Sequence, residues 1–231
     1  MTEPDTAARL QLLADEPLEI VGLLEGASNG TFLSRLGTED LAVYKPQRFE
    51  RPLWDFPPGL DRREVAAFEL SEALGWNLVP ATVLRAGPVG PGSVQWFENV
   101  DLEHHYFTLR EETGHQLALQ KMCLFDLIAN NTDRKSGHCL VTETGHLIGI
   151  DHGLCFATDF KIRTVLWDFA GEAVPADLRA DIARAAKNAD AVNELLDEHE
   201  QAALLQRMQV VAELDVFPAD ESGRRYPWPL V

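Results

Sequence analysis

The chain has 231 residues, of which 45% are hydrophobic, and a formal net charge of −17 at pH 7. This length and apolar content suffice for one compact globular unit, including two lobes that share a cleft. No stretch approaches the roughly 18 uninterrupted apolar residues of a membrane span, and the first residues are acidic where a signal peptide is basic. We therefore expect a cytoplasmic protein, and the negative charge disfavours nucleic acid and anionic membrane surfaces as partners.

The chain has three cysteines, Cys123, Cys139 and Cys155. They are widely spaced among apolar residues and form no C-x-x-C pair, so we expect reduced core residues and no metal or redox centre. His104, His105 and His115 lack a cysteine or carboxylate at a recognised ligand spacing, which argues against a metal site there.

The first half of the chain is rich in strand-like segments, after a short N-terminal stretch that we expect to be disordered. Three short runs separated by glycine-containing segments predict antiparallel strands at residues 18–25, 31–36 and 41–45. Residues 46–58, rich in proline and aromatic residues, predict an ordered surface loop. A helix should follow, with Asp61 as its N-cap and Gly75 at its end. Residues 94–97 predict one more strand.

The second half of the chain is mostly helical. Residues 113–130 have helical spacing, with an apolar side formed by Leu117, Leu124 and Ile128. Helices are also predicted at residues 176–186 and about 192–214, where one buried stripe would contain Leu178, Ile182, Leu195, Leu196, Leu204 and Met208. Strands first and helices later predict an α+β fold with two lobes. We expect one domain, with an N-terminal lobe and hinge at about residues 15–97 and a C-terminal lobe at residues 98–231.

A predicted hairpin joins two polar segments, residues 130–138 and Asp151-His152-Gly153. Its strands are residues 139–142 and 147–150, and its loop is Glu143-Thr144-Gly145. A three-residue loop would place His138 opposite Ile150, and a two-residue turn would place it opposite Asp151 itself. In either register the hairpin brings Asp133, His138 and Asp151 to the same end of a two-stranded ribbon.

This convergence of polar groups suits phosphoryl transfer. In such a reaction one aspartate orients the attacking hydroxyl, and another holds the magnesium that neutralises the phosphates. The alternative is an ordinary surface turn, since Asn, Asp, Ser and Gly are common turn residues. The hairpin favours the functional interpretation.

The same residues resemble a known family. Asp133-Arg134, a ligand position five residues after Asp133, a hairpin and then hydrophobic-Asp-x-Gly resemble the catalytic segment of phosphatidylinositol 3- and 4-kinase-like and HipA-type kinases. Residues 130–138 and 149–153 are similar to a group of actinobacterial phosphatidylinositol-kinase-like proteins. The resemblance covers about residues 18–169, and its specific part is residues 133–153. It implies a protein-kinase-like fold that binds ATP and a divalent metal, with Asp133 as the catalytic aspartate and Asp151 as the metal aspartate.

The resemblance also assigns roles in the N-terminal half. The phosphate-covering loop would offer backbone N–H groups from Ser28, Asn29 and Gly30, unless this glycine segment is a simple turn. Lys45 would hold the α and β phosphates, with Glu64 as its partner. Asp61-x-x-Glu64 is also a capping box, in which the glutamate bonds to the helix N-terminus and need not contact a lysine.

The adenine would lie against a hinge. The resemblance assigns that hinge to Gln95, Trp96 and Phe97, whose backbone groups would bond the base and whose aromatic rings would form a wall. The alternative is that the two aromatic residues belong to the core.

The chain departs from the family at one metal position. The residue five positions after Asp133 is usually asparagine, and here it is His138. Magnesium prefers oxygen ligands and imidazole suits manganese better, so we expect either one protein-bound Mg²⁺ at Asp151 or a tolerance for Mn²⁺. The alternative is a histidine that bonds only the loop backbone. We also expect Arg134 to pair with a carboxylate such as Asp126 and Lys135 to meet the γ-phosphate, and we group both with Asp133 as catalytic residues.

The acceptor is less defined than the nucleotide site. Lys161 and Arg163 are the two basic residues where a substrate-recognition segment is expected, which disfavours a phosphorylated lipid headgroup. We expect a protein hydroxyl or a small molecule as the acceptor. The alternatives are a pseudokinase scaffold, a nucleotidyl transferase that adds AMP, and a metal-dependent hydrolase built on His138, Asp151 and His152.

Overall fold

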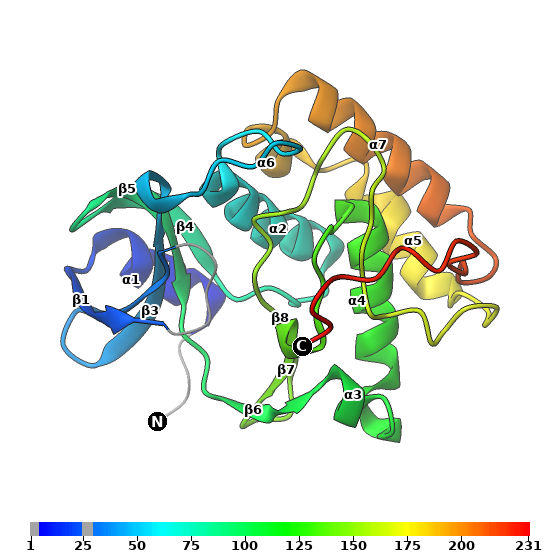
Figure 1. Ribbon diagram of the computed structural model, residues 1–231, viewed down its shortest axis with the longest axis horizontal. Coiled ribbons are helices and arrows are strands. Elements are labelled where there is room, and N and C mark those ends of the chain that lie inside the picture. Colours follow the sequence, from blue (N-terminus) through cyan, green and yellow to red (C-terminus); the bar gives the residue numbers. More distant parts are fainter. Residues whose placement is uncertain (1–4, 25–29) are drawn as a thin grey trace.

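The computed structural model describes residues 5–24 and 30–231, which form two lobes (Figure 1). The N-terminal lobe contains an antiparallel sheet in the order β1-β2-β3-β5-β4. Its strands are β1 (Leu18–Leu23), β2 (Phe32–Leu36), β3 (Asp40–Pro46), β4 (Thr82–Gly87) and β5 (Gly90–Trp96). The predicted three-stranded meander is confirmed, and β5 contains most of the strand predicted at residues 94–97. β4 was not predicted, because it is an edge strand in which only Thr82 is buried.

A helix occupies the segment that was expected to be disordered. This helix, α1 (Thr6–Asp15), begins at Asp5, whose side chain accepts a hydrogen bond from the Ala8 N–H at 2.8 Å. Leu13 is fully buried, and the helix packs against β4 and β5. Arg9 Nη1 lies 2.6 Å from Glu98 Oε1, which ties the helix to the segment after β5. Burial of one apolar side and a proper N-cap explain why this segment is ordered.

The second helix of this lobe, α2 (Leu60–Leu74), follows the short turn η1 (Gln47–Phe49) and the predicted loop. Gly75 ends it as predicted, with a φ of 72° that favours glycine. Its N-cap is Gly59, and the Glu50 carboxylate accepts hydrogen bonds from the N–H groups of Gly59 (3.1 Å) and Asp61 (3.0 Å). The prediction of Asp61 as the N-cap was therefore wrong, because a loop residue nine positions upstream of Gly59 supplies the acceptor.

The C-terminal lobe contains a small antiparallel sheet, β6-β7-β8, and a group of helices (Figure 1). The strands are β6 (Val100–His105), β7 (Cys139–Thr142) and β8 (Leu147–Gly149). The helices and helical turns are α3 (Tyr106–Leu109), η2 (Thr113–His115), α4 (Gln116–Ala129), η3 (Ser136–His138), α5 (Ala176–Ala185), α6 (Asp190–Asn193) and α7 (Glu198–Ala212). β6 was not predicted. The helix predicted at residues 192–214 is divided in two, because a capping box between Asp197 and Glu200 begins a new helix.

Most of the predicted apolar stripe is buried. The buried members are Leu178, Ile182, Leu196, Leu204 and Met208, and Leu195 is partly buried. In α4, Leu124 and Ile128 are fully buried, but Leu117 is 54% exposed. The prediction was wrong for Leu117, because the first turn of α4 extends beyond the core that buries the rest of the helix. Among the residues described, no helix combines the length and the apolar character needed to cross a bilayer.

Although α2 belongs to the first half of the chain, it is fastened to the C-terminal lobe. Arg63 donates a hydrogen bond to Glu200 of α7, and both side chains are buried. Just beyond the end of α2, Trp76 Nε1 donates to Asp181 Oδ2 of α5 at 3.0 Å. A buried ion pair and an indole hydrogen bond therefore hold both ends of α2 against the helices of the other lobe.

The close pairing of β5 with β3 at Gly92 requires a glycine and generates a first prediction. A Cβ added at Gly92 would lie 2.3 Å from the backbone oxygen of Lys45, and a backbone atom cannot move aside as a flexible side chain does. We expect Gly92→Ala to lower the free energy of unfolding by about 2–3 kcal/mol, measured by urea denaturation. Gly114→Ala is the matched control, since no atom lies within 4 Å of its added Cβ. Equal losses in the two variants would contradict this account.

Candidate active site

Lys45 links the N-terminal sheet to both of the elements that face it. Its Nζ lies 2.5 Å from Glu64 Oε1 of α2 and 2.9 Å from Asp151 Oδ1, just after β8. Burial lowers the pKa of Lys45, but the Asp151 and Glu64 carboxylates outweigh it, so the net pKa is raised above its ordinary value. The lysine is therefore a fixed positive charge between two carboxylates.

Glu64 is the point at which α2 meets the loop after β8. Its Oε2 accepts a hydrogen bond from the His152 N–H at 3.0 Å, and its Oε1 accepts one from the Gly153 N–H at 3.1 Å. Glu64 Oε1 also pairs with Lys45 Nζ, as predicted. The alternative role of Glu64 in a capping box is excluded, because the N-cap residue of α2 makes no side-chain hydrogen bond. Gly153 lies close to α2, since an added Cβ would be 3.2 Å from Leu60 Cβ.

The β7–β8 hairpin has the three-residue loop that was predicted as one of two registers. Cys139 pairs with Gly149, and the Thr142 N–H donates to His146 O at 2.9 Å. The Ile150 N–H donates to His138 O at 3.1 Å, so His138 lies opposite Ile150. The register places His138 one residue from Asp151, as the three-residue loop requires.

Asp151 has an uncommon backbone conformation and an ionised side chain. Its φ is 59°, a left-handed value that is unusual for a residue other than glycine. The Lys45 ammonium holds the pKa of the Asp151 carboxyl well below its usual range. Oδ1 faces Lys45, while Oδ2 lies 3.7 Å from His138 Nε2. Unusual backbone values of this kind are common at functional sites, because surrounding contacts must maintain them.

His138 and Asp151 fit a divalent cation as a two-ligand pair. Burial lowers the pKa of His138 to about 4, so the imidazole is neutral at neutral pH. His138 Nδ1 is buried and has no hydrogen-bond partner among the described residues. Within residues 5–24 and 30–231 no group of three or more histidine, cysteine or acidic side chains forms a metal site. A cation here would therefore take its other ligands from phosphate oxygens and water, as Mg²⁺ does when it is bound with a nucleotide.

Asp133 lies in the loop between α4 and η3, with its side chain 27% exposed. Its backbone N–H donates to Asn131 Oδ1 at 3.0 Å, and its Oδ2 lies 3.2 Å from Lys135 Nζ. Burial raises the pKa of Asp133, and Lys135 opposes that shift. The charge of Asp151 also acts on Asp133, which agrees with the predicted convergence of the two aspartates at one end of the hairpin.

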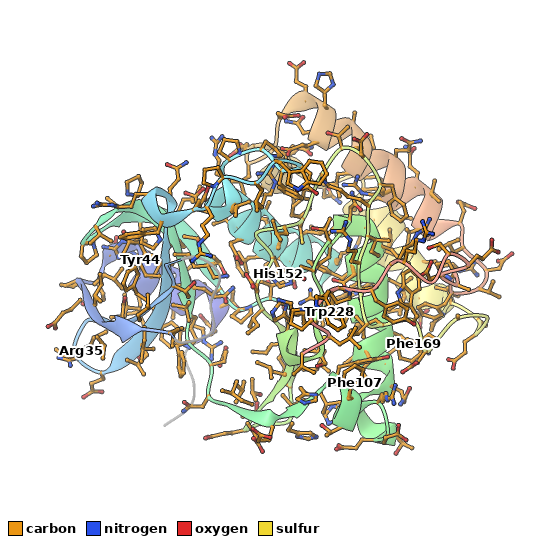
Figure 2. The ribbon with its side chains drawn as sticks, in the orientation of Figure 1. Arg35, Tyr44, Phe107, His152, Phe169 and Trp228 are labelled. Atoms are coloured by element: carbon orange, nitrogen blue, oxygen red, sulfur yellow. The ribbon has the colours of Figure 1, made fainter. Side chains whose placement is uncertain are left out.

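Arg134 is an internal clamp. Its guanidinium bonds the Asp126 carboxylate, with Nη2 at 2.9 Å from Oδ1, as the sequence led us to expect. The same group donates to Ile150 O at 3.0 Å and lies 2.7 Å from Nε2 of His152, which is labelled in Figure 2. Arg134 is fully buried, with 0% exposure, so its grouping with residues that touch a substrate was wrong. It instead joins the Asp133 loop to the Asp151 loop.

The predicted hinge residues are engaged inside the N-terminal lobe. The Trp96 N–H donates to Ala81 O at 2.8 Å, and the Phe97 N–H donates to Leu41 O at 3.2 Å. The Gln95 side chain donates to Thr82 Oγ1 at 2.9 Å. The Trp96 and Phe97 N–H groups are therefore already used within this lobe, and the bonding of adenine by other backbone groups of Gln95, Trp96 and Phe97 stays a prediction.

The predicted phosphate-covering loop is only partly described. Ser28 and Asn29 lie outside the described residues. Gly30 packs directly against the side chain of Phe49, since an added Cβ would lie 2.8 Å from Phe49 Cβ. A close approach of backbone to side chain thus explains the glycine at this position.

Several residues that shape the site were not singled out from the sequence. Asn131 Nδ2 donates to Asp126 Oδ1 at 3.1 Å, and Thr164 Oγ1 donates to Asp126 Oδ2 at 2.9 Å. Of these two donors, only Asn131 lies in a polar segment identified from the sequence, residues 130–138. Far from this site, Glu112 lies between His104 (2.7 Å) and His115 (3.6 Å), so a carboxylate accompanies these histidines after all.

The buried pair of Asp126 and Arg134 generates a second prediction. Asp126→Asn would leave a buried guanidinium without its counter-charge, and we expect the free energy of unfolding to fall by about 3–5 kcal/mol. Chemical denaturation measures the loss. The control is Asp215→Asn, which removes a carboxylate that is 90% exposed and paired with Arg179, and which should change stability little. Equal losses in the free energy of unfolding from the two substitutions would show that burial of the Asp126–Arg134 pair does not increase its contribution to stability.

Comparisons with known proteins agree with this arrangement. A family model of phosphatidylinositol 3- and 4-kinases matches residues 81–217. Protein Rv2133c of Mycobacterium tuberculosis is 36% identical over 260 aligned positions, covering 94% of each chain. Among solved structures, the Golgi casein kinase has a TM-score of 0.54 at 16% identity, covering 93% of this chain and 79% of that one.

Two further structures have similar folds. The Golgi casein kinase with Mn and ADP bound has a TM-score of 0.54 at 16% identity, covering 98% of this chain and 80% of that one. The Helicobacter pylori proinflammatory kinase CtkA has a TM-score of 0.53 at 14% identity, covering 89% and 94%. The fold is thus the two-lobed, kinase-like α+β fold that the sequence predicted, and the chain belongs to the phosphatidylinositol 3- and 4-kinase family.

Proposed function

We propose that this chain is an ATP-dependent phosphotransferase that moves the γ-phosphoryl group to a hydroxyl of a protein or a small molecule. One observation carries the proposal: Glu64, Lys45 and Asp151 form a continuous chain of ion pairs beside Asp133. Phosphoryl transfer depends mainly on positioning and charge stabilisation, and these are the properties that such a chain supplies.

Lys45 is suited to bind phosphate oxygens. Its ammonium is held by carboxylates from two different elements, so its position is set before any ligand arrives. A compact ammonium with three donors can bond Glu64, Asp151 and a phosphate oxygen together. Membership of the kinase family and the solved Golgi casein kinase with Mn and ADP support a nucleotide as that ligand.

Asp133 is suited to orient the acceptor hydroxyl. Its raised pKa makes it a better proton acceptor than an exposed aspartate. In the proposed step the hydroxyl oxygen forms a bond to the γ-phosphorus, and the bond from that phosphorus to the bridging oxygen breaks. ADP leaves with the electron pair, and the hydroxyl proton passes to the Asp133 carboxylate. Lys135, 3.2 Å from Asp133, would lie beside the transferred group.

Asp151 and His138 would hold a divalent cation, which would neutralise phosphate charge. Asp151 Oδ2 and His138 Nε2 are 3.7 Å apart, a separation that allows both to contact one ion. An imidazole ligand favours Mn²⁺ relative to a site with oxygen ligands only. The same imidazole supports a second candidate, a nucleotide-binding pseudokinase, because the usual oxygen ligand is missing. Transfer of AMP remains a further alternative on this site.

The basic residues near the site support an acceptor other than a phosphorylated lipid headgroup. Lys161 is engaged by the other lobe, with its Nζ 3.8 Å from Asp55 Oδ2 and 4.7 Å from the centre of the Phe56 ring. Of the two basic residues in the predicted recognition segment, Arg163 is therefore the one left to meet an anionic acceptor. One arginine is a weak site for a headgroup that carries several phosphates.

The third prediction tests turnover. Asp133→Ala should reduce ADP release at least about 100-fold, because it removes the group that orients the acceptor, while thermal stabilisation by ATP persists. Lys45→Met should weaken both nucleotide stabilisation and turnover. Lys187→Met, in the segment between α5 and α6, is the control. Wild-type protein that is stabilised by ATP without turnover would identify a pseudokinase, and mass spectrometry of the acceptor would distinguish adenylyl from phosphoryl transfer.

The fourth prediction concerns the metal. His138→Asn replaces an imidazole with an amide oxygen, and we expect the ratio of Mn²⁺ to Mg²⁺ affinity to fall about tenfold. Electron paramagnetic resonance of Mn²⁺, titrated against Mg²⁺ with a non-hydrolysable ATP analogue, measures this ratio without turnover. An unchanged ratio would mean that His138 does not contact the metal.

A further inference from the structure

The segment formed by residues 224–231 crosses the C-terminal lobe beside the Asp133 loop. Figure 1 shows it in red, running from the region of α5 and α7 toward β7 and β8. It contains no helix or strand, and residues 228–229 form a bend. The carbonyl oxygens of Arg225 and Leu230 accept hydrogen bonds from the lobe, so the segment binds partly through its backbone.

Two of these carbonyls bond residues that border Asp133. The Ser136 N–H, three residues after Asp133, donates to Leu230 O at 2.8 Å. The Thr164 N–H donates to Arg225 O at 3.0 Å, and Trp167 Nε1 donates to the same oxygen at 3.1 Å. The residues that bind the segment therefore come from both the catalytic loop and the stretch after Arg163.

The stretch at Thr164 is itself attached to the Asp133 loop. The Arg134 N–H donates to Arg163 O at 3.0 Å, and the Val165 N–H donates to Arg134 O at 3.1 Å. Residues 163–165 therefore run alongside Arg134, and residues 224–231 occupy the outer edge of the same backbone layer. A chain bound along this edge therefore contacts Ser136, three residues after Asp133.

The segment is held weakly for its length. Trp228 is 88% exposed and Val231 is 63% exposed, and Pro227 is the buried residue among these eight. The guanidinium of Arg225 lies over the Phe160 ring at 5.4 Å, at the surface. Ordering eight residues costs conformational entropy that offsets much of what a few neutral hydrogen bonds return, so little net free energy opposes displacement.

The part of the segment nearest the catalytic loop cannot accept a phosphoryl group. Residues 227–231 are Pro-Trp-Pro-Leu-Val, and none carries a hydroxyl. Two of the five are prolines, which also lack the N–H that a full backbone ladder needs. Residues 227–231 therefore lack a reactive hydroxyl, whereas Tyr226, earlier in the segment, carries one.

From these contacts we infer that the edge formed by the Ser136 and Thr164 N–H groups is a docking site for polypeptide backbone, that the acceptor is a polypeptide, and that residues 224–231 occupy this edge until they are displaced. The acceptor part of this inference rests on the proposed phosphotransferase function. The two N–H groups bind carbonyls from separate residues of one chain, Arg225 and Leu230, an arrangement that a small molecule does not offer.

The test uses the 231-residue chain and a synthetic peptide with the sequence of residues 224–231. Arg225→Ala with Pro227→Gly removes the Phe160 contact and loosens the segment, and we expect hydrogen exchange at the Ser136 and Thr164 amides to accelerate at least tenfold. Trp228→Ala, which changes an exposed side chain, is the control and should leave exchange unchanged. Added peptide should restore protection in the double variant and have no effect on wild type, where the attached segment has the higher effective concentration.

A second variant, a chain that ends at Trp228, lacks the Leu230 carbonyl by construction and so exposes the Ser136 N–H. If the peptide fails to protect the Ser136 amide in this variant, the inferred docking site is wrong. With dephosphorylated casein as the probe acceptor, we expect initial phosphoryl transfer to rise several-fold in both variants, and an unchanged rate would overturn the role of the segment. Protection by the peptide without any transfer to casein would support the docking site and count against the phosphotransferase proposal.

Discussion

The arrangement of the site depends on the carboxylate of Glu64. It is almost fully buried, and it accepts hydrogen bonds from Lys45 Nζ of β3 and from the N–H groups of His152 and Gly153 after β8. A buried carboxylate is costly unless a cation and hydrogen-bond donors surround it. Meeting that requirement brings β3, α2 and the Asp151 loop together, so the charge that would hold phosphate and the carboxylate that would hold a metal are positioned by the same group.

The attachment of α2 to the C-terminal lobe determines which contacts connect the two lobes at the site. Arg63 and Trp76 hold the two ends of α2 to α7 and α5, and Glu64 holds its middle to the Asp151 loop. α2 also packs against β4 and β5 of the sheet, and Lys45 adds an ionic contact from β3. The lysine is therefore the charged link between the sheet and the Asp151 loop.

The clamp at Arg134 performs the corresponding task inside the C-terminal lobe. A fully buried arginine needs most of its donors satisfied, and Asp126, Ile150 O and His138 O together satisfy them. The sequence led us to group Arg134 with the catalytic residues because it follows Asp133 directly. Its burial shows why adjacency is misleading, since neighbouring side chains in an extended loop point to opposite sides, and one of them can face solvent while the next enters the core.

What the sequence determined by itself is local: the Asp133–His138–Asp151 convergence follows from hairpin register, which depends only on loop length and strand alternation. The family resemblance added the pairing of Lys45 with Glu64, which no spacing rule could supply. Only the tertiary structure decided which donors were already used, such as the N–H groups of Trp96 and Phe97, and which acceptor caps α2. It also decided where residues 224–231 lie. These outcomes depend on contacts between distant segments, and local patterns carry no information about which segments meet.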